Sequence, residues 1–539
     1  MHALTAPLSE LAEIEEICEE RGREPGMLLL SGCVTSQKTH LMYALGKDYG
    51  HTLIVLSSED KAKKLYEEYR FLNENTSYYP AKDLLFYQAD IHGKQLVKQR
   101  METLQMMMEA KSQVTVITTI DGFMDELPSE AEIKGDILTI SNGEALEFES
   151  LKEKIIKLGY DREAQVDGPG QFAVRGGIID IYPLTEELPI RIEFWGDEVD
   201  SIRTFDVDSQ RSVENLEQIV IYPADDRLGS DRKVSFINYF DPKDTLVFLD
   251  EPARLLEKGR LAENEVEKAR ENRAEEMERT GEMEEAPEFF TTDEIIKFLN
   301  KFCMIGMCAL EMKCKPFFVK KRFGIQAKSV NPYNSSFEML TQDLKRLKRN
   351  GYRAVLISGS RTRAKRLAED LRDYDLSSFY SEDQEREVNP GEIMVCYGHI
   401  EVGYEYPMIK FIVISESDIF GKTKKKKKRK SYDGQKISSF SDLKPGDYVV
   451  HENHGLGIYR GIEKIEVDKV TKDYMKISYA DGGNLYILAT QLDQIQKYAS
   501  ADAKKPKLNK LGGQEWHRTK SKVKTAVWQI AKDLVELYA

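Results

Sequence analysis

Residues 27–45 read MLLLSGCVTSQKTHLMYAL, which is an apolar run, then a turn of small and polar residues, then a stretch with helical character. This order predicts a strand, a loop and a helix in direct succession. It recurs where TLIVLSS at 52–58 precedes a charged amphipathic segment at 59–72, and where VTVITT at 114–119 follows a predicted helix through 98–108. Alternating strands and helices favour a parallel sheet covered by helices, so the fold class is α/β.

The strand pattern changes to a period of two between about 148 and 211. There, QFAVRGGIIDIYP (171–183) and PIRIEFWGDEVDSIRTFD (189–206) alternate apolar and polar residues around glycine turns. Such alternation predicts an antiparallel sheet. The α/β style returns with TLVFLDEPARLL at 245–256. The sequence therefore predicts one α/β domain (1–147 and 212–320) that is split by an antiparallel insert (148–211).

Three further regions follow the split domain. Residues 321–420 predict a second, small α/β domain, and 421–435 form a basic linker that contains KTKKKKKRK. Residues 436–501 predict a small β module with short strands and a glycine-rich hairpin turn. The last stretch, 502–539, predicts a linker and the start of a connecting helix, because its apolar residues recur at helical spacing.

Composition limits the class of protein. The 539 residues suggest roughly three or four domains, and 41% hydrophobic with 32% charged residues allows packed cores under a charged surface. The net charge of -14 excludes a surface that binds nucleic acid throughout, so DNA contacts must be local. We find no apolar run of bilayer length and no signal segment, and we expect a cytoplasmic protein without a membrane partner. The six cysteines show no C-x-x-C pair, which predicts reduced thiols and no metal.

The turn after the first strand has the form of a phosphate-binding loop. In GCVTSQKT, Gly32, Lys38 and Thr39 have the required spacing, but Gln37 stands where a second glycine lets the loop wrap a phosphate. Asp250 and Glu251 close the strand TLVFL as the matching pair of acids. The sequence therefore predicts a vestigial nucleotide site without a catalytic residue, made of Gly32, Lys38, Thr39, Asp250 and Glu251. The alternative is a working helicase-like ATPase.

Several segments resemble the bacterial transcription-repair coupling factors. They are SVNPYNSSFEML (329–340), LISGSRTRAKRLAEDLRDY (356–374), YGHIEVGYEYP (397–407) and VISESDIFG (413–421). The split domain and its insert are also similar to the damage-handling component of the bacterial excision nuclease, and 443–498 is similar to the CarD-like, Tudor-like polymerase-binding module. The resemblance implies a degenerate RecA-like first domain, and a motor that would follow this chain. ATP, magnesium and most DNA contacts would belong to that motor, so we expect no cofactor in this part, and a monomer.

The resemblance also implies residues for two partners. The insert would bind the damage-recognition subunit of excision repair (UvrA) through Arg162, Arg175, Arg191 and Glu193. A further arginine of the family pattern falls on Ala173, which departs from it. A solvated sheet edge is the alternative. If the arginines serve binding, replacing Arg175 and Arg191 should abolish UvrA binding and leave thermal stability nearly unchanged.

The second partner would be the β subunit of RNA polymerase. GIYRGIEKIEV (457–467) is a candidate edge strand, with Ile458 and Ile462 on one face and Tyr459, Glu463 and Ile465 on the other. We predict Tyr459, Glu463 and Ile465 as polymerase-binding residues; the resemblance places Ile465 at the contact, although it could equally fill the core of the module. These features predict a binding scaffold of transcription-coupled repair. A free-standing CarD-type transcription regulator remains a third hypothesis.

Overall fold

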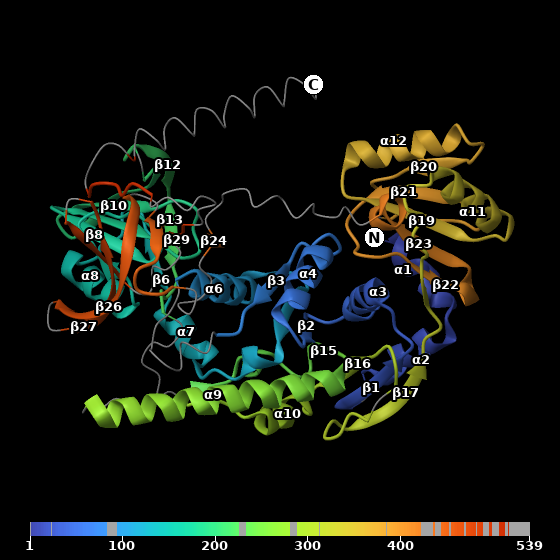
Figure 1. The fold of residues 1–539 in the computed structure, drawn as a ribbon, viewed down its shortest axis with the longest axis horizontal. Helices are drawn as coiled ribbons and strands as arrows, with labels where there is room; N and C mark the ends of the chain where they lie inside the picture. Colours follow the sequence, from blue (N-terminus) through green and yellow to red (C-terminus); the bar gives the residue numbers. More distant parts are fainter. Residues whose placement is uncertain are drawn as a thin grey trace. The chain divides into compact units, whose positions relative to one another are not determined.

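The computed structural model describes sixteen segments of the chain (Figure 1): residues 2–22, 24–82, 94–207, 209–225, 233–280, 288–311, 313–383, 385–421, 435–436, 443–451, 454–467, 470–480, 482–488, 495–498, 506–511 and 516. Contacts divide the chain into two compact units, of which the first spans Met1–Lys82, Lys98–Lys268 and Pro287–Lys426. The second spans Asp83–Val97, Ala269–Ala286 and Lys427–Ala539. Among the helices of these segments, none has both the length and the apolarity that a bilayer crossing requires.

The first unit begins with a seven-stranded sheet in which every neighbouring pair runs parallel. Its order is β17-β1-β16-β15-β2-β4-β3, with bounds β1 Gly26–Ser31, β2 His51–Leu56, β3 Thr76–Tyr79, β4 Val114–Thr119, β15 Thr245–Asp250, β16 Cys303–Met307 and β17 Val319–Gly324. The central strands are apolar and almost wholly buried, as expected for parallel strands covered on both faces. The predicted multidomain α/β fold is confirmed.

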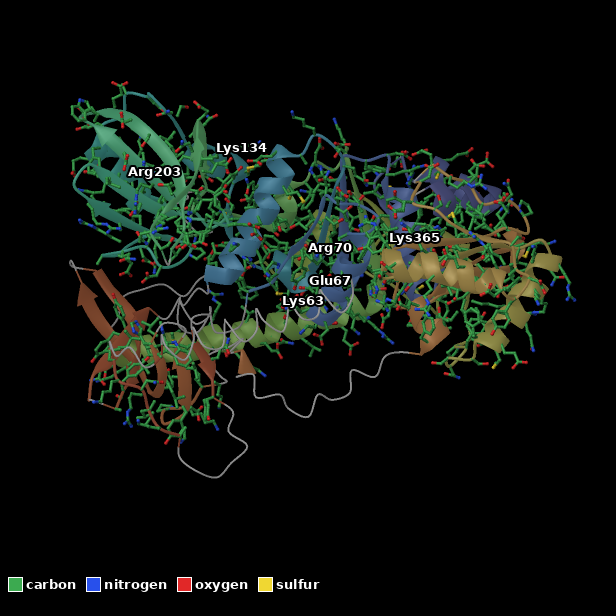
Figure 2. The ribbon with its side chains drawn as sticks, turned by 90° about the horizontal axis from the view of Figure 1, so that it is seen from above. Lys63, Glu67, Arg70, Lys134, Arg203 and Lys365 are labelled. Atoms are coloured by element: carbon green, nitrogen blue, oxygen red, sulfur yellow. The ribbon has the colours of Figure 1, made fainter. Side chains whose placement is uncertain are left out.

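Most helices around this sheet have one apolar and one solvated side, whereas α3 (Thr35–Gly46) is buried on nearly all sides. The helices are α1 His2–Thr5, η1 Ala6–Glu10, α2 Ala12–Glu20, α3 Thr35–Gly46, α4 Glu59–Tyr69, α6 Lys94–Glu109, α9 Pro252–Thr280 and α10 Thr292–Leu299. Figure 2 shows Lys63, Glu67 and Arg70 together along α4. Lys63 pairs with Glu59 at 2.5 Å, and all of these side chains are largely exposed. The charges of Lys63, Glu67 and Arg70 therefore belong to a solvated face of α4 and its end.

The insert is a six-stranded sheet of order β12-β11-β10-β9-β8-β7, antiparallel except between β7 and β8. Its strands are β7 Asp161–Arg162, β8 Gln171–Arg175, β9 Ile178–Tyr182, β10 Ile190–Trp195, β11 Glu198–Phe205 and β12 Ser212–Leu216. Helix α8 (Phe148–Lys157) covers one face with Leu151 and Ile155. The same core takes Ile140 from β6 (Leu138–Ser141) and Ile219 from β13 (Gln218–Ile221), so it extends past both ends of the predicted 148–211.

The small α/β domain has a six-stranded sheet of order β18-β22-β23-β19-β21-β20. Its elements are β18 Lys328–Ser329, α11 Phe337–Arg349, β19 Arg353–Ser358, α12 Arg361–Arg372, β20 Ser378–Tyr380, β21 Ile393–Tyr397, β22 Tyr404–Tyr406, β23 Phe411–Ser415 and α13 Glu416–Phe420. Helices α11 and α12 pack on one face through leucines and alanines. The segment 319–324 pairs with β1 of the first sheet, so this domain begins after 324.

The other face of this second sheet shares a core with the split domain. One continuous apolar cluster contains Val355, Tyr404 and Phe411 of the small domain together with Leu4 of α1 and Leu41 of α3, all at most 3% exposed. Helices α1 and α3 of the split domain therefore cover the face of the second sheet that lies opposite α11 and α12. The predicted separate domain is covered on this side by its neighbour.

His40 connects the two domains inside this core. Its Nε2 lies 2.6 Å from the carbonyl oxygen of Leu4, and its Nδ1 lies 3.2 Å from the hydroxyl of Tyr406. A carbonyl can only accept, so Nε2 carries the proton and Nδ1 accepts from the tyrosine. Burial lowers the pKa of His40 to about 4, which keeps the imidazole neutral. At the rim, Arg353 binds the carboxylate of Glu10 at 2.6 and 3.2 Å.

Glu68 lies on the inner side of α4 and is only 6% exposed. Burial raises its pKa to about 8, although hydrogen bonds with Ser36 and Thr39 oppose this shift. The backbone N–H of Val402, from the small domain, donates to the Ser36 hydroxyl at 3.1 Å. A protonated carboxyl therefore lies where the two domains meet.

The second unit contains a six-stranded antiparallel sheet of order β24-β29-β25-β26-β27-β28. Its strands are β24 Gln435–Lys436, β25 Tyr448–His451, β26 Gly455–Val467, β27 Val470–Ser478, β28 Asn484–Leu488 and β29 Ile495–Lys497. The core of this β module is small and contains Val449, Met475, Ile477 and Ile487. β26 and β27 are the longest strands and form a hairpin.

We expect Glu68→Gln to weaken the pH dependence of stability of the first unit. The folded-state pKa of about 8 exceeds the ordinary 4.5, so the wild-type chain loses stability as the pH rises from 4.5 to 8. The neutral amide removes this loss, which at about 1.4 kcal/mol per pKa unit amounts to at most about 5 kcal/mol. Melting curves at several pH values between these limits measure it. Glu67→Gln, on the exposed side of α4, is the control, and parallel curves for wild type and Glu68→Gln would contradict the assignment.

Candidate functional sites

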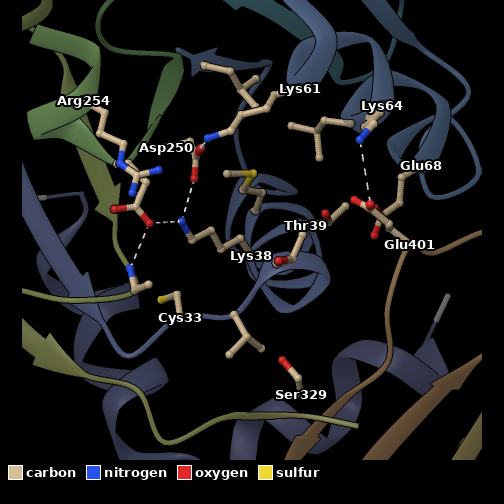
Figure 3. Close-up of a pocket in the computed structure, with 17 residues that line it drawn as sticks. Cys33, Lys38, Thr39, Lys61, Lys64, Glu68, Asp250, Arg254, Ser329 and Glu401 are labelled. Carbon is tan, nitrogen blue, oxygen red and sulfur yellow. Dashed lines mark hydrogen bonds and ion pairs between the residues drawn. The ribbon is translucent and has the colours of Figure 1, made fainter. Parts of the chain in front are cut away.

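A cavity of about 490 Å³ lies at the carboxyl ends of the first sheet's strands, next to the loop predicted to bind phosphate (Figure 3). Helices α3 and α4, the end of β15 and two residues of the small domain form its walls. The lining residues are Cys33, Val34, Thr35, Lys38, Thr39, Met42, Leu56, Lys61, Lys64, Leu65, Glu68, Asp250, Glu251, Arg254, Ala309, Ser329 and Glu401. Lys38, Thr39, Asp250 and Glu251 are thus brought together as the sequence predicted.

The N–H groups of the loop donate to atoms of the protein itself. Gly32 N donates to the carbonyl of Ala309 at 3.3 Å, and Cys33 N donates to that of Cys308 at 3.1 Å. Gly32 has a φ of +79°, and a Cβ there would collide with the carbonyl oxygen of Ile325, so a glycine is required. In a phosphate-binding loop such N–H groups converge on the anion. Here two of them already have acceptors.

The side chain of Gln37 also accepts a hydrogen bond from a loop N–H group. It is fully buried, and its side-chain Oε1 accepts from the N–H of Val34 at 3.1 Å. Val34 directly precedes α3, so Gln37 caps the helix from its third position. The residue that replaces the glycine therefore stabilises the helix start and uses a third N–H of the loop.

Lys38 is held by the two acids predicted as its partners. Its Nζ lies 2.7 Å from Asp250 and 2.7 Å from Glu251, and Lys61 approaches Asp250 at 3.4 Å. Burial alone would lower the pKa of Lys38, but the two carboxylates outweigh it and raise that pKa above its usual value. Glu251 has a φ of +52° and also accepts from the N–H of Ala309 at 3.0 Å. Its carboxylate takes the contacts that a phosphate would need.

The outer face of the insert carries a network centred on Asp180, which is 1% exposed. Arg191 donates to both carboxylate oxygens at 2.6 and 2.9 Å, and Arg175 donates to one of them at 2.9 Å. The guanidinium of Arg191 also lies 4.5 Å from the ring centre of Phe205. The hydrogen bonds to Asp180 raise the pKa of Arg191. The two predicted arginines meet on one buried carboxylate.

This geometry changes what we expect of the two arginines. Removing both would leave Asp180 buried without a cation, which is strongly destabilising. The prediction that Arg175→Ala with Arg191→Ala leaves thermal stability unchanged is therefore at odds with the structure. Sequence patterns locate charged residues on a face, but they do not show that a buried acid from the neighbouring strand holds them.

The remaining predicted residues of the insert are nearer to solvent. Glu193 accepts from Ser201 at 3.0 Å and from Arg203, and Arg162 is exposed at the far edge on β7. Sequence reasoning missed Trp195, which is 83% exposed at the end of β10. Strand alternation places it on the same face as Arg191 and Glu193. A tryptophan directly before a Gly-Asp turn, in EFWGDE, was the available signal.

In the β module, the predicted alternation along β26 stops at a β-bulge. Tyr459 pairs with Ile477, but the next pair is Gly461 with Lys476, so Arg460 is the extra residue. After the bulge, Ile462 pairs with Met475, and the predicted opposite faces of Tyr459 and Ile462 become one face. Tyr459 is 5% exposed and belongs to the core of the module. Its predicted role as a surface contact is therefore not supported by its position.

Glu463 is exposed and forms an ion pair with Lys476 at 2.8 Å. The backbone of Ile465 pairs with Lys472, but its side chain lies outside what the structure describes, so the choice between polymerase contact and core stays open. The lysine-rich run 422–430 also lies outside the described residues, as does the terminal helix apart from Trp516. In the described segments, no group of three or more histidine, cysteine or acidic side chains is placed to hold a metal.

Two parts of the chain match known domain families. Residues 138–226 match the family described as the UvrB interaction domain. Residues 443–499 match the family described as the CarD-like/TRCF RID domain. The first range corresponds to the core of the insert from β6 to β13, and the second to most of the β module.

Relatives with a curated name align along almost the whole chain. The transcription-repair-coupling factor of Bacillus subtilis (strain 168) is 30% identical over 577 residues, covering 95% of this chain and 48% of that protein. That of Staphylococcus haemolyticus (strain JCSC1435) is 29% identical, with 95% and 48% covered. The chain spans about half the length of the curated relatives it matches. Over 95% of its length the chain is similar to transcription-repair-coupling factors, and it contains domains of two families, the UvrB interaction domain and the CarD-like/TRCF RID domain.

Proposed function

We propose that this chain is the docking part of a transcription-coupled repair factor, binding RNA polymerase through the β module and UvrA through the insert. The observation that carries the proposal is that two domains of interaction families are joined to an ATPase-like domain whose nucleotide loop is filled by its own side chains. ATP, magnesium and the main DNA contacts would belong to the half of the relatives that this chain does not span.

The insert would bind UvrA with the face that carries Asp180. Arg175 is half exposed, so it offers free guanidinium donors beside the buried acid. Trp195 adds a large apolar surface at the hairpin end, and aromatic residues next to arginines are typical centres of protein interfaces. This combination supports an acidic and partly apolar partner surface.

The β module would bind the polymerase β subunit with the outer part of the β26–β27 hairpin. The pairing of β26 with β27 continues as far as Val467 and Val470, well beyond the compact core that begins near Tyr459. A long antiparallel arm of this kind can add to the sheet of a partner. Glu463 and Lys476 form a charged pair on the arm that would select the register.

We expect Trp195→Ala to weaken UvrA binding about tenfold or more, because it removes an exposed apolar anchor. Its melting temperature should stay within about 1 °C of wild type, since the side chain is exposed. Isothermal titration with purified UvrA measures the affinity. Ile156→Ala, half exposed on α8 across the sheet, is the matched control. Equal affinities for wild type and Trp195→Ala would remove the hairpin end from the interface.

We expect Ile465→Arg to weaken binding of the polymerase β subunit, because it introduces an unpaired charge into an apolar contact. A pull-down with purified core polymerase measures this, and UvrA binding should be unchanged. Trp195→Ala is the reciprocal control and should retain polymerase binding. Unchanged polymerase affinity would exclude Ile465 from the interface, and a large loss of thermal stability would assign it to the core of the module.

We expect no saturable ATP binding at the loop of the first domain. Lys38 is already neutralised by two acids, so millimolar Mg-ATP should not raise the melting temperature measurably. Lys38→Ala should lower that temperature by several degrees, because Glu251 loses the cation at 2.7 Å, whereas Asp250 retains the 3.4 Å contact with Lys61. A thermal shift that saturates with ATP and disappears in Lys38→Ala would favour the ATPase instead.

A further inference from the structure

At the start of β26, one side of Leu456 is not paired with any strand in the described part of the chain. Leu456 lies opposite Val450 of β25, whereas on the other side β27 ends at Ser478, which pairs with Ile458. A strand residue directs its N–H and C=O to the same side, and Leu456 directs both away from β25. These groups need partners, because unpaired polar backbone at a buried position is costly.

Asn509 supplies these partners from 53 residues further along the chain. Its side-chain Oδ1 accepts from the N–H of Leu456 at 2.7 Å, and its own N–H donates to the carbonyl of Leu456 at 3.0 Å. The N–H of Ala480 donates to the carbonyl of Asn509 at 3.0 Å. One residue therefore completes the sheet edge where β27 has ended.

The surroundings of Asn509 fit this arrangement closely. Gly455 has a φ of +78°, and a Cβ there would lie 2.5 Å from Asn509 Oδ1 and 3.0 Å from the ring of Trp516. Leu511 packs against the core of the β module. The segment 506–511 is thus held at its centre by hydrogen bonds and near its end by apolar contact.

We propose that Asn509 is a structural latch that holds segment 506–511 at the root of the β26–β27 hairpin. The chain that leaves the β module is thereby fixed to the strand that continues into the docking arm. This role rests on the proposed polymerase docking, but the latch itself can be tested without polymerase.

The test is limited trypsin digestion of the full 539-residue chain, with peptides quantified by mass spectrometry. Lys507 and Lys510 flank Asn509 and are exposed, so cleavage after them reports release of the latch. Asn509→Ala removes one acceptor from Leu456, and we expect cleavage at these lysines to rise roughly five- to tenfold. Cleavage elsewhere should not change.

Two variants make the test specific. Asn509→Asp keeps an oxygen at the same place and should restore resistance close to wild type. Gly482→Ala strains the backbone at a φ of +78° elsewhere in the β module, with open space around it, and should leave the two sites resistant, so it controls for a general loss of stability. Equal cleavage of wild type and Asn509→Ala, or no rescue by Asn509→Asp, would overturn the proposal. Failure of the chain to bind polymerase would instead count against the docking function alone.

Discussion

The first unit depends on one apolar layer that two sheets share. Helices α1 and α3 contribute Leu4 and Leu41 to a cluster that also contains Val355 and Phe411 of the second sheet. Each fully buried side chain of this size contributes about 1.5–3 kcal/mol, so the layer fixes the small domain against the split domain. Neutral His40 lies inside it, hydrogen-bonded on both sides. The loop, the cavity and the start of α3 take their positions from this packing.

The loop after β1 and the start of α3, from Gly32 to Thr39, form their hydrogen bonds and ion pairs within the protein. A phosphate would have to displace two carboxylates from Lys38. It would also have to replace Ala309, Cys308 and Gln37 as the acceptors of the loop N–H groups. Ion pairs that are largely removed from water are expensive to break, because each charge left behind is poorly solvated. The loop and Lys38 therefore have internal partners for these charges and N–H groups.

Sequence periodicity predicted the α/β elements and the antiparallel sheet, because burial imposes regular spacing on strands and helices. The spacing of Lys38 and the position of Asp250 also predicted that they would meet at the end of the sheet. The shared core was not predictable, since a pattern shows that a face is apolar but not which element covers it. The bulge at Arg460 was missed because one inserted residue leaves the composition of a strand unchanged.

The insert separates residues that maintain the fold from residues that are free to bind. Arg191 is committed to Asp180, so its loss would affect stability and recognition together. Trp195 contributes little to the core, since most of its surface faces solvent. Burial of an exposed tryptophan by a partner is favourable, because it removes apolar surface from water and requires no change in the fold. Affinity for a partner can therefore change at the hairpin end while the Asp180 network keeps the sheet intact.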